Sequence, residues 1–347
     1  MLSDLNTSLE IVEAGVSTPA GIGLLRCASA VRCSNNIAKA GKYFTEGGEG
    51  IPVAEIDDAF LPPLSSSKDS VEDAKFQRLL KLSISALLDL RNRYENLNQK
   101  ALLILLPDDF IGLDFIAHLE QQMGIEFHRE HSSEYGVNAA ADLFAKASIM
   151  LESNSEQEII IGSADTRCDA NSLANLLGEN RLLVNENADG FIPGEGAGFA
   201  VIKKNKAKES QGLSISAWGD GHEKLPVLSQ GLAIGDGLSQ AINTALANRE
   251  AITIATVLNN FNGESWCGKE WGVARMRNHQ SFQQDEKMFH PAAVFGDVGG
   301  AHLIIMLGLA LIGFRKSYYE FPLLISFSQE QGERVVLVLT QNGVDSE

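Results

Sequence analysis

The sequence is short of basic residues, of cysteine and of proline, and each shortage narrows the class of protein. Its 347 residues include 28 Lys and Arg against 45 Asp and Glu, a formal net charge of −17. So negative a chain is a poor partner for nucleic acid or for an anionic membrane. The four cysteines form no CxxC pair and no zinc-binding spacing, so we expect reduced thiols. Nine prolines against 32 glycines favour closely packed elements over disorder.

Long apolar runs and targeting segments are also lacking. The longest apolar run, residues 303–314, is too short to span a bilayer and is interrupted by Gly308 and Gly313. Residues 1–13 contain three acidic and no basic residues, unlike a signal peptide. We therefore expect a cytoplasmic protein without a membrane partner.

The remaining pattern predicts an α/β protein. Residues 101–106 and 158–163 are fully apolar runs of the kind found in strands that are buried on both faces of a parallel sheet. Residues 71–94 carry leucines at helical spacing. Residues 41–67, rich in glycine and proline, are predicted to be an irregular excursion.

The order of predicted strands and helices occurs twice, in residues 1–207 and again in residues 208–347. Each copy includes a helix rich in small or apolar residues, at 136–151 and at 296–314. Alternating strands and helices imply parallel βαβ units with right-handed crossovers. We expect two similar halves in one compact unit.

The most specific segment is ADGFIPGEGAGFAVIK, residues 188–203. Glycines at 194, 196 and 198 predict a tight turn, with close backbone approach or positive φ, leading into a strand at residues 199–202. The segment resembles DGF-x-x-GEGAG of the β-ketoacyl synthases, condensing enzymes of the thiolase superfamily. Weaker likenesses are EIIIGSADT, NGESWCGKEWGVARMR and GDVGGAHLIIMLGLAL, which begin at residues 158, 262 and 296.

The resemblance implies a thiolase-like fold, with two pseudo-repeated βαβ halves in a layered αβαβα arrangement. It also implies an acyltransferase of fatty-acid or polyketide biosynthesis, a 3-oxoacyl-acyl-carrier-protein synthase. Members of the family dimerise through an edge strand of the first half, for which residues 158–163 are our candidate. The implied partners are a second copy or an active synthase, and an acyl carrier protein. Carrier proteins are acidic and dock on basic patches, which the charge of −17 disfavours.

The family's catalytic residues are absent at the matching positions. The family has a cysteine nucleophile at the N-terminus of the first buried helix, where a helix dipole lowers the thiol pKa; Val137 stands there. Asn260 and Asp297 replace its two histidines, and Ala292 replaces its lysine. Residues 328–331, SQEQ, replace its glycine-rich gating loop. The resemblance thus points to a degenerate member with no intact Cys-His-His set, and neither a cofactor nor a metal is predicted.

Two hypotheses for function follow. In the first, the chain is a non-catalytic subunit that pairs with an active synthase. In the second, it performs altered acyl-thioester chemistry without a covalent intermediate, with Asp297, Asn260 and Glu264 as pocket groups. Ser132 and Ser133 could serve as nucleophiles only in a rebuilt loop, and we expect them to cap a helix.

Histidines outside the matched positions are interpreted as structural. His128 and His131, together with Glu134, are a candidate metal site, but a short polar stretch favours an exposed surface cluster. His302, inside an apolar helix, is expected to be a satisfied core residue.

The polar stretch at residues 262–277 has two interpretations. Glu264 and Glu270 are plausible general bases, but charge pairs on a surface or dimer-facing helix are favoured. Cys267 is the best stray thiol, although no helix N-terminus is predicted for it in the first half. The glycine run at 296–300 lacks the strand-to-helix context of a dinucleotide loop.

Overall fold

The computed structural model describes residues 8–65, 73–205, 212–224, 235–247, 249 and 252–342. The elements of the first half are β1 (Leu9–Thr18), β2 (Gly21–Ile22), α1 (Leu24–Arg32), β3 (Lys39–Phe44), β4 (Gly50–Val53), α2 (Ala74–Arg91), β5 (Ala101–Leu106), α3 (Phe115–Met123), β6 (Ser133–Gly136), α4 (Ala140–Glu152), β7 (Glu158–Thr166), α5 (Ala170–Gly178) and β8 (Glu195–Lys204). Those of the second are β9 (Leu213–His222), α6 (Asp236–Leu246), β10 (Ile254–Asn259), α7 (Ser265–Arg277), β11 (Phe282–Phe289), α8 (Ala292–Phe295), α9 (His302–Arg315), β12 (Leu323–Ser328) and β13 (Glu333–Gln341).

The strands have the same order in both halves. It runs β6-β5-β7-β8-β1 in the first half and β11-β10-β12-β13-β9 in the second. Counted along the chain within each half, both orders read 3-2-4-5-1. The fifth strand is antiparallel to the fourth in each case, whereas the second, third and fourth are parallel. This duplication confirms the predicted layered α/β fold.

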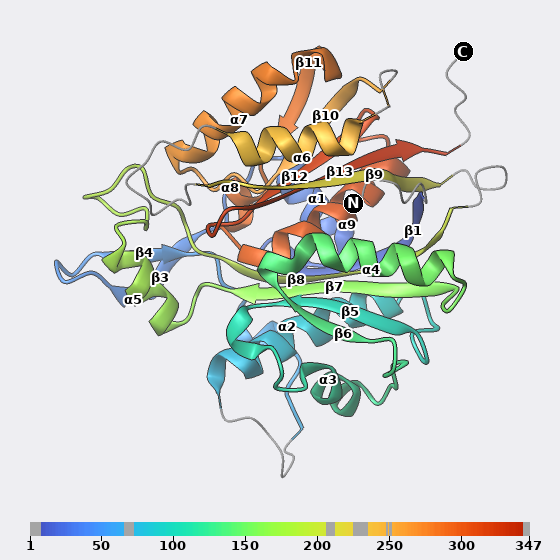
Figure 1. Ribbon diagram of the computed structural model, residues 1–347. Coiled ribbons are helices and arrows are strands. Elements are labelled where there is room, and N and C mark those ends of the chain that lie inside the picture. Colours follow the sequence, from blue (N-terminus) through green and yellow to red (C-terminus); the bar gives the residue numbers. More distant parts are fainter. Residues whose placement is uncertain are drawn as a thin grey trace.

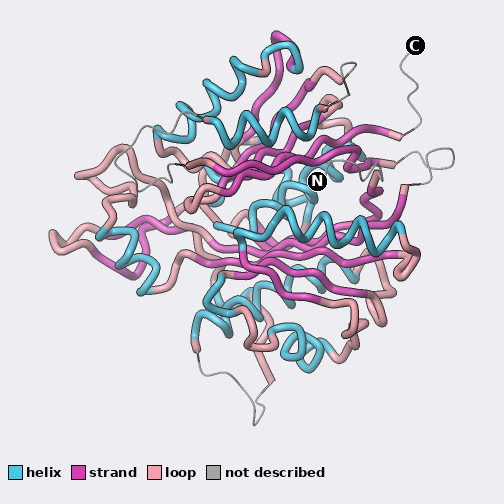
Figure 2. Tube along the Cα trace, viewed as in Figure 1, coloured by secondary structure: helices cyan, strands magenta, loops and turns pink. Residues whose placement is uncertain are grey.

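Two sheet layers enclose a central layer of helices (Figures 1 and 2). β1 pairs with β9 at only three positions, Leu9–Ile11, where the two sheets meet. α4 and α9 lie between the sheets, α2 and α3 cover the first sheet from outside, and α6 and α7 cover the second (Figure 1). Every residue from His302 to Gly313 in α9 is buried, as a helix that is apolar all round requires. No helix among the described residues is long and apolar enough to cross a bilayer.

The glycine-rich segment is a strand, and the predicted turn is wrong. Gly196 and Gly198 lie within β8, which pairs with β1 and β7, and neither they nor Gly194 have a positive φ. The expected close approach is present. A Cβ on Gly198 would lie 2.8 Å from the backbone nitrogen of Ile305 in α9. The glycines therefore let the first sheet touch the central helix.

Polar strands were missed. Residues 41–67 contain the β3–β4 hairpin, and β6 and β11 were not predicted. β3 is mostly exposed and gives no apolar periodicity. The helix predicted to begin at residue 296 begins instead at His302.

The helix expected at residues 71–94 is α2, and residues 71–72 lie outside the described residues. In the second half, α6 begins at Asp236, with Gly235 as its N-cap residue.

Residues 158–163 are not an edge strand. They lie in β7, which is hydrogen-bonded to β5 on one side and β8 on the other. The outermost strands of the described sheet are β6 in the first half and β11 in the second. The apolar run of β7 reflects burial in the middle of the sheet.

Candidate functional site

The three positions matched to the family triad lie on elements that meet at the start of α9. Asn260 follows β10, Asp297 precedes α9, and Val137 follows β6. A Cβ on Gly300 would lie 2.1 Å from Cγ1 of Val137, so the valine packs directly on the backbone entering α9. The Asp165 carboxylate, at the end of β7, accepts the N–H of Gly300 at 2.8 Å.

Asp297 is buried and fully engaged. Its Oδ1 accepts the N–H of Gly299 at 2.9 Å, and its Oδ2 accepts the side-chain amide of Asn262 at 2.8 Å. Arg167 Nε lies 3.7 Å from Oδ1. Burial opposes ionisation, but Arg167 and the hydrogen bonds outweigh it and hold the pKa of Asp297 below its ordinary value. The backbone carbonyl of Asp297 accepts the N–H of Gly194, so β8 fixes the loop.

Asn260 fastens the segment that replaces the gating loop. Its Nδ2 donates to the carbonyl of Ser328 at 2.9 Å, and its Oδ1 accepts the Ser328 N–H at 3.0 Å. The side-chain amide thus pairs with the end of β12 as a neighbouring strand would. Both of its polar atoms are used for structure.

Two arginines and two glutamates occupy the space between these positions. Arg181 makes a bidentate pair with Glu264, at 2.8 and 2.6 Å, and its NH1 lies 2.8 Å from Glu330. Arg167 also bonds Glu330. Burial opposes the charges of both arginines, but the neighbouring carboxylates raise their pKa values above the ordinary range. For Glu330 burial raises the pKa, and the two arginines outweigh it and lower it. The two arginines and Glu330 therefore stabilise one another's charged forms.

The remaining cavity is almost closed. It has about 10 Å³ of free volume, roughly room for one water molecule. Its lining comprises Arg167, Arg181, Asn260, Asn262, Trp266, Cys267, Asp297, Ser328 and Glu330. An acyl chain or any other drug-sized ligand needs a pocket of several hundred Å³.

The thiol nearest to this cluster is unreactive. Cys267 lies in the first turn of α7, in the second half of the chain, and its Sγ donates to Asn262 Oδ1 at 3.6 Å. Burial raises the pKa of the Cys267 thiol well above its usual value. A buried, protonated thiol is a poor nucleophile.

His302 is a core residue that is only half satisfied. Its Nδ1 lies 3.3 Å from the Gly299 carbonyl and 3.6 Å from Asp297 Oδ1, while Nε2 has no hydrogen-bond partner among the described residues. The ring stacks on Phe295. Burial lowers the pKa of His302 to about 4, so the ring is neutral at pH 7.

Glu264 and Glu270 are not on a surface, contrary to expectation. Glu264 is 6% and Glu270 0% exposed. Glu270 accepts Arg334 Nε at 2.6 Å, and both side chains are fully buried. The favoured interpretation holds for Arg277, which forms an exposed pair with Asp236. Apolar periodicity is absent in α7, so the sequence did not reveal its buried side.

Ser132 is not available as a nucleophile. Its Oγ donates to the His128 carbonyl at 3.0 Å and accepts the Leu102 N–H at 2.9 Å. Ser133 begins β6 and caps no helix. The loop is thus braced by Ser132.

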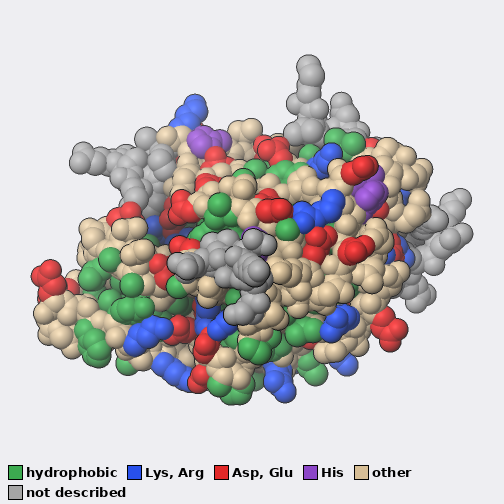
Figure 3. Space-filling model, turned by 90° about the horizontal axis from the view of Figure 1, so that it is seen from below, with side chains coloured by type: hydrophobic (Ala, Val, Ile, Leu, Met, Phe, Trp, Pro, Cys, Tyr) green, Lys and Arg blue, Asp and Glu red, His purple; other side chains and the backbone are tan. Residues whose placement is uncertain are grey.

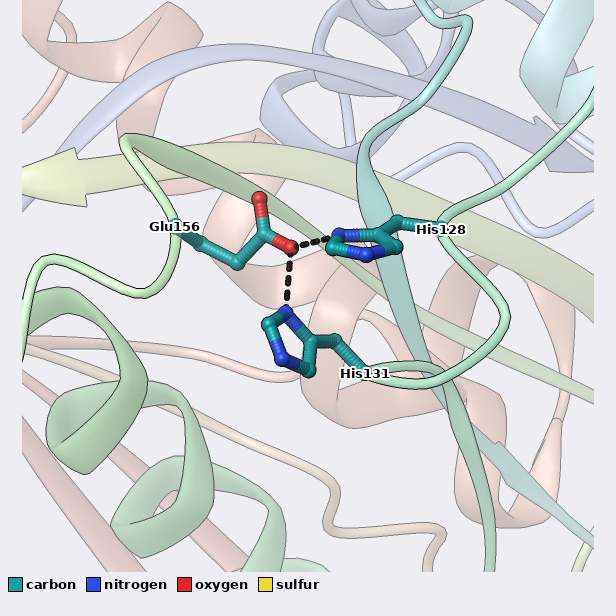
Figure 4. A group of neighbouring side chains, drawn as sticks. All are labelled: His128, His131 and Glu156. Atoms are coloured by element: carbon teal, nitrogen blue, oxygen red, sulfur yellow. Dashed lines mark hydrogen bonds and ion pairs between the residues drawn. The ribbon is translucent and has the colours of Figure 1, made fainter.

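The histidine cluster has a different acid from the predicted one. Glu134 accepts the N–H groups of Ile116 and Gly112 and so belongs to the start of α3. Glu156, in the loop before β7, lies between the rings of His128 and His131 (Figure 4).

Sequence reasoning missed Arg167 and Arg181. Both lie in irregular loops that follow β7 and α5, where no periodicity marks a buried face. A signal was nevertheless present. The acidic residues Glu264, Asp297 and Glu330 were all placed near one pocket, and buried carboxylates need buried cations.

A larger hollow lies elsewhere. It has about 570 Å³ of free volume and is lined by the β3–β4 hairpin, the start of α2 and the ends of β7 and β8. Two of the basic side chains that line this hollow form ion pairs with acidic ones, Arg78 with Glu195 and Lys42 with Glu55. Glu195, of the GEGAG segment, therefore joins α2 to β8.

Solved structures with a similar fold were found, although sequence comparisons found no match. No family model and no curated protein matches the sequence. Among solved structures, a ketosynthase in complex with its chain length factor from Xenorhabdus doucetiae is similar, with a TM-score of 0.73 and 13% identity over 96% of this chain and 98% of that one. The ishigamide ketosynthase/chain length factor gives 0.72, with 15% identity over 97% and 100%.

A third similar structure is the ketosynthase from module 6 of the bacillaene synthase of Bacillus subtilis 168. Its TM-score is 0.71, with 14% identity over 98% of this chain and 73% of that chain. Identities at this level show a shared fold. The chain therefore has the thiolase-type α/β fold of the ketosynthases.

Proposed function

We propose that this chain is a ketosynthase-fold subunit that performs no condensation itself and pairs with an active ketosynthase. The observation that carries this proposal is the filled site. Where a condensing enzyme needs an open pocket beside a thiol, this chain has Val137 and an ion-paired cluster around a cavity of about 10 Å³.

The hydrogen bonds and ion pairs of Asn260, Glu264 and Asp297 disfavour the alternative, an enzyme of altered acyl-thioester chemistry. Such an enzyme needs groups that can exchange a proton with a substrate. Asn260 is bonded to backbone on both polar atoms, and Glu264 is held by Arg181 and Asn262. Asp297 is buried beneath Asn262 and Arg167. No described member of this set is left free to meet a thioester.

The similar structures favour a paired subunit of polyketide type. Two of the similar structures are described as a ketosynthase with a chain length factor. A further one, with a TM-score of 0.70, is described as an acyl carrier protein in complex with its ketosynthase. Among the described strands, β6 is the outer strand of the first sheet and pairs only with β5, so one side of it is open to strand pairing. We place the pairing surface there, with an active ketosynthase favoured over a second copy.

Direct docking of an acyl carrier protein is the weaker part of the proposal. Carrier proteins are acidic, and on the face shown in Figure 3 the basic side chains lie singly among acidic and apolar ones. We therefore assign carrier binding mainly to the partner synthase.

Two experiments test the proposal. The protein is incubated with an acyl-carrier-protein thioester, and intact mass is measured with an active ketosynthase as positive control. We expect no acyl adduct; an adduct on any residue of this chain contradicts the non-catalytic assignment.

Pairing is tested by co-expression with candidate ketosynthases of the same organism, followed by size-exclusion chromatography and native mass spectrometry. We expect a 1:1 complex with one of them. A homodimer that ignores every candidate contradicts the partner role.

A further inference from the structure

His128, His131 and Glu156 converge at the end of the first sheet opposite the candidate site. His128 and His131 lie in the loop before β6, and Glu156 lies in the loop before β7. They are thus at the N-terminal ends of these strands, whereas Arg167 follows the C-terminal end of β7. The nine residues of β7 span roughly 30 Å. The cluster is therefore separate from the ion-paired cavity.

Both rings present the same atom to the same carboxylate oxygen (Figure 4). Nδ1 of His131 lies 2.7 Å from Glu156 Oε1, and Nδ1 of His128 bonds that oxygen too. The ring centroids are 4.3 Å apart. The three potential ligand atoms lie within 4.8 Å of one another. Around a zinc ion with bonds of about 2.0 Å, ligand atoms lie roughly 3.3 Å apart, so a small outward shift makes room for one.

The surrounding contacts hold this arrangement in place. The N–H groups of His131 and Ser132 donate to the His128 carbonyl at 3.0 Å each, which closes a turn and puts both rings on one side. Ser132 Oγ ties the turn to Leu102 of β5. Ser155 Oγ bonds the Met150 carbonyl and steadies the loop that carries Glu156.

The basic residue adjacent to His128 in sequence, Arg129, does not pair with the Glu156 carboxylate. Arg129, between the two histidines in sequence, is bonded to Glu120 and Asp114 of the α3 region. Glu156 has an exposed side-chain fraction of 10%, against 37% and 32% for the two histidines. A partly covered carboxylate thus meets two accessible imidazoles, which a metal ion can reach from solvent.

We propose that His128, His131 and Glu156 bind a divalent transition metal, with Zn²⁺ as the best match. Two imidazole nitrogens and one carboxylate oxygen suit this borderline ion, and water completes four-coordination. The metal binds the Nδ1 lone pair of each neutral ring, which then carries its hydrogen on Nε2, and an oxygen of the Glu156 carboxylate. It fastens the loop before β6 to the loop before β7. Metal binding here does not depend on whether the chain pairs with a synthase.

The test uses full-length protein without a histidine tag, freed of metal with a chelator. Cys33 is an exposed thiol, so the Cys33→Ser background removes a competing soft ligand. Titration with Zn²⁺ should show one equivalent bound per chain. Affinity should fall about 100-fold or more in His128→Asn and His131→Asn, and at least about 10-fold in Glu156→Gln, since ligands matter no less than their supporting contacts.

Matched controls lie in the same chain. Glu130→Gln changes a neighbouring acid, and His222→Asn breaks a single exposed pair of histidine with Glu333. Both should bind Zn²⁺ as the parent does. Binding that survives both His128→Asn and His131→Asn overturns the proposal, as does failure to bind stoichiometrically at micromolar Zn²⁺.

A measurement on the unmutated protein guards against misfolded variants. Co²⁺ in place of Zn²⁺ should give the visible absorption of a four-coordinate site, and X-ray absorption of the Zn²⁺ form should show two imidazoles with oxygen ligands. A ligand shell containing sulfur, or one without imidazole, overturns the assignment.

Discussion

Arg181 and Glu264 form a buried bidentate ion pair that links the two halves of the chain. Arg181 Nε and NH2 donate to the two carboxylate oxygens of Glu264 at 2.8 and 2.6 Å. The arginine comes from the loop between α5 and β8, and the glutamate is the N-cap residue of α7. Arg181 also lines the cavity of about 10 Å³, so the pair lies where the two halves of the chain meet around that cavity.

Removing this arginine should destabilise the protein strongly. Arg181→Ala leaves Glu264 and Glu330 buried without their cation, and breaking a buried pair in this way costs about 3–5 kcal/mol. Urea unfolding measures the change in the free energy of unfolding. Arg277→Ala, which breaks the exposed pair with Asp236, is the control and should cost at most about 1 kcal/mol. Equal effects of the two variants would contradict a structural role for Arg181.

The free energy of unfolding should decrease as the pH is lowered, because of His302. The pKa of this buried ring is lowered from 6.5 to about 4, so as pH falls the unfolded chain takes up the proton first. The contribution of the neutral ring is complete above pH 6.5 and is lost progressively between 6.5 and 4. The loss is at most roughly 3 kcal/mol.

Urea unfolding from pH 7 to pH 4.5 tests this dependence. In His302→Asn the slope in this window should shrink, whereas His279→Asn, at an exposed site, should leave it unchanged. Asp297 and Glu330, whose pKa values are lowered, add a further loss of stability at lower pH, as the pH falls toward and through their folded pKa values. A slope that is the same in the parent and in His302→Asn would exclude the histidine as its source.

Gly300 should tolerate no side chain while Val137 is present. A Cβ there would lie 2.1 Å from Val137 Cγ1, so Gly300→Ala should cost about 1–3 kcal/mol through overpacking. Val137→Ala removes the clashing methyl groups, and the double variant should recover part of the loss. Gly268→Ala in α7 meets no atom within 4 Å and should be neutral or stabilising. Additive effects of the two substitutions would show that the contact is absent.

Asn260 should control the mobility of the segment after β12. Asn260→Ala removes both bonds to Ser328, so the backbone amide of Ser328 should exchange with deuterium faster. The free energy of unfolding should fall by about 1–3 kcal/mol. Asn260→Asp, which can still accept but not donate, should lie in between. Unchanged exchange at Ser328 in Asn260→Ala would mean that the end of β12 is held by other contacts.

Much of the architecture could be predicted from the sequence. The apolar runs of β5 and β7 and the largely apolar α9 indicated buried elements, because burial on two faces requires apolar side chains. The layered arrangement was predicted from the resemblance of the glycine-rich segment, which the structure places in a strand and not in a turn. The resemblance also predicted that the reactive groups are absent, because Val137, Asn260 and Asp297, at the matched positions, cannot perform the attack of a thiol supported by two histidines.

The contacts that these positions make could be seen only once the chain was folded. Arg181 and Glu264 are 83 residues apart, and no local sequence pattern can predict a pair at that separation. Likewise, the acid beside His128 is Glu156 and not the predicted Glu134. The sequence also did not show which strands lie at the edge of the sheet. The apolar β7 lies inside the sheet, and the polar β6 is the outermost described strand of the first half. Hydrophobic periodicity reports how deeply a segment is buried, but which charges meet there depends on long-range packing.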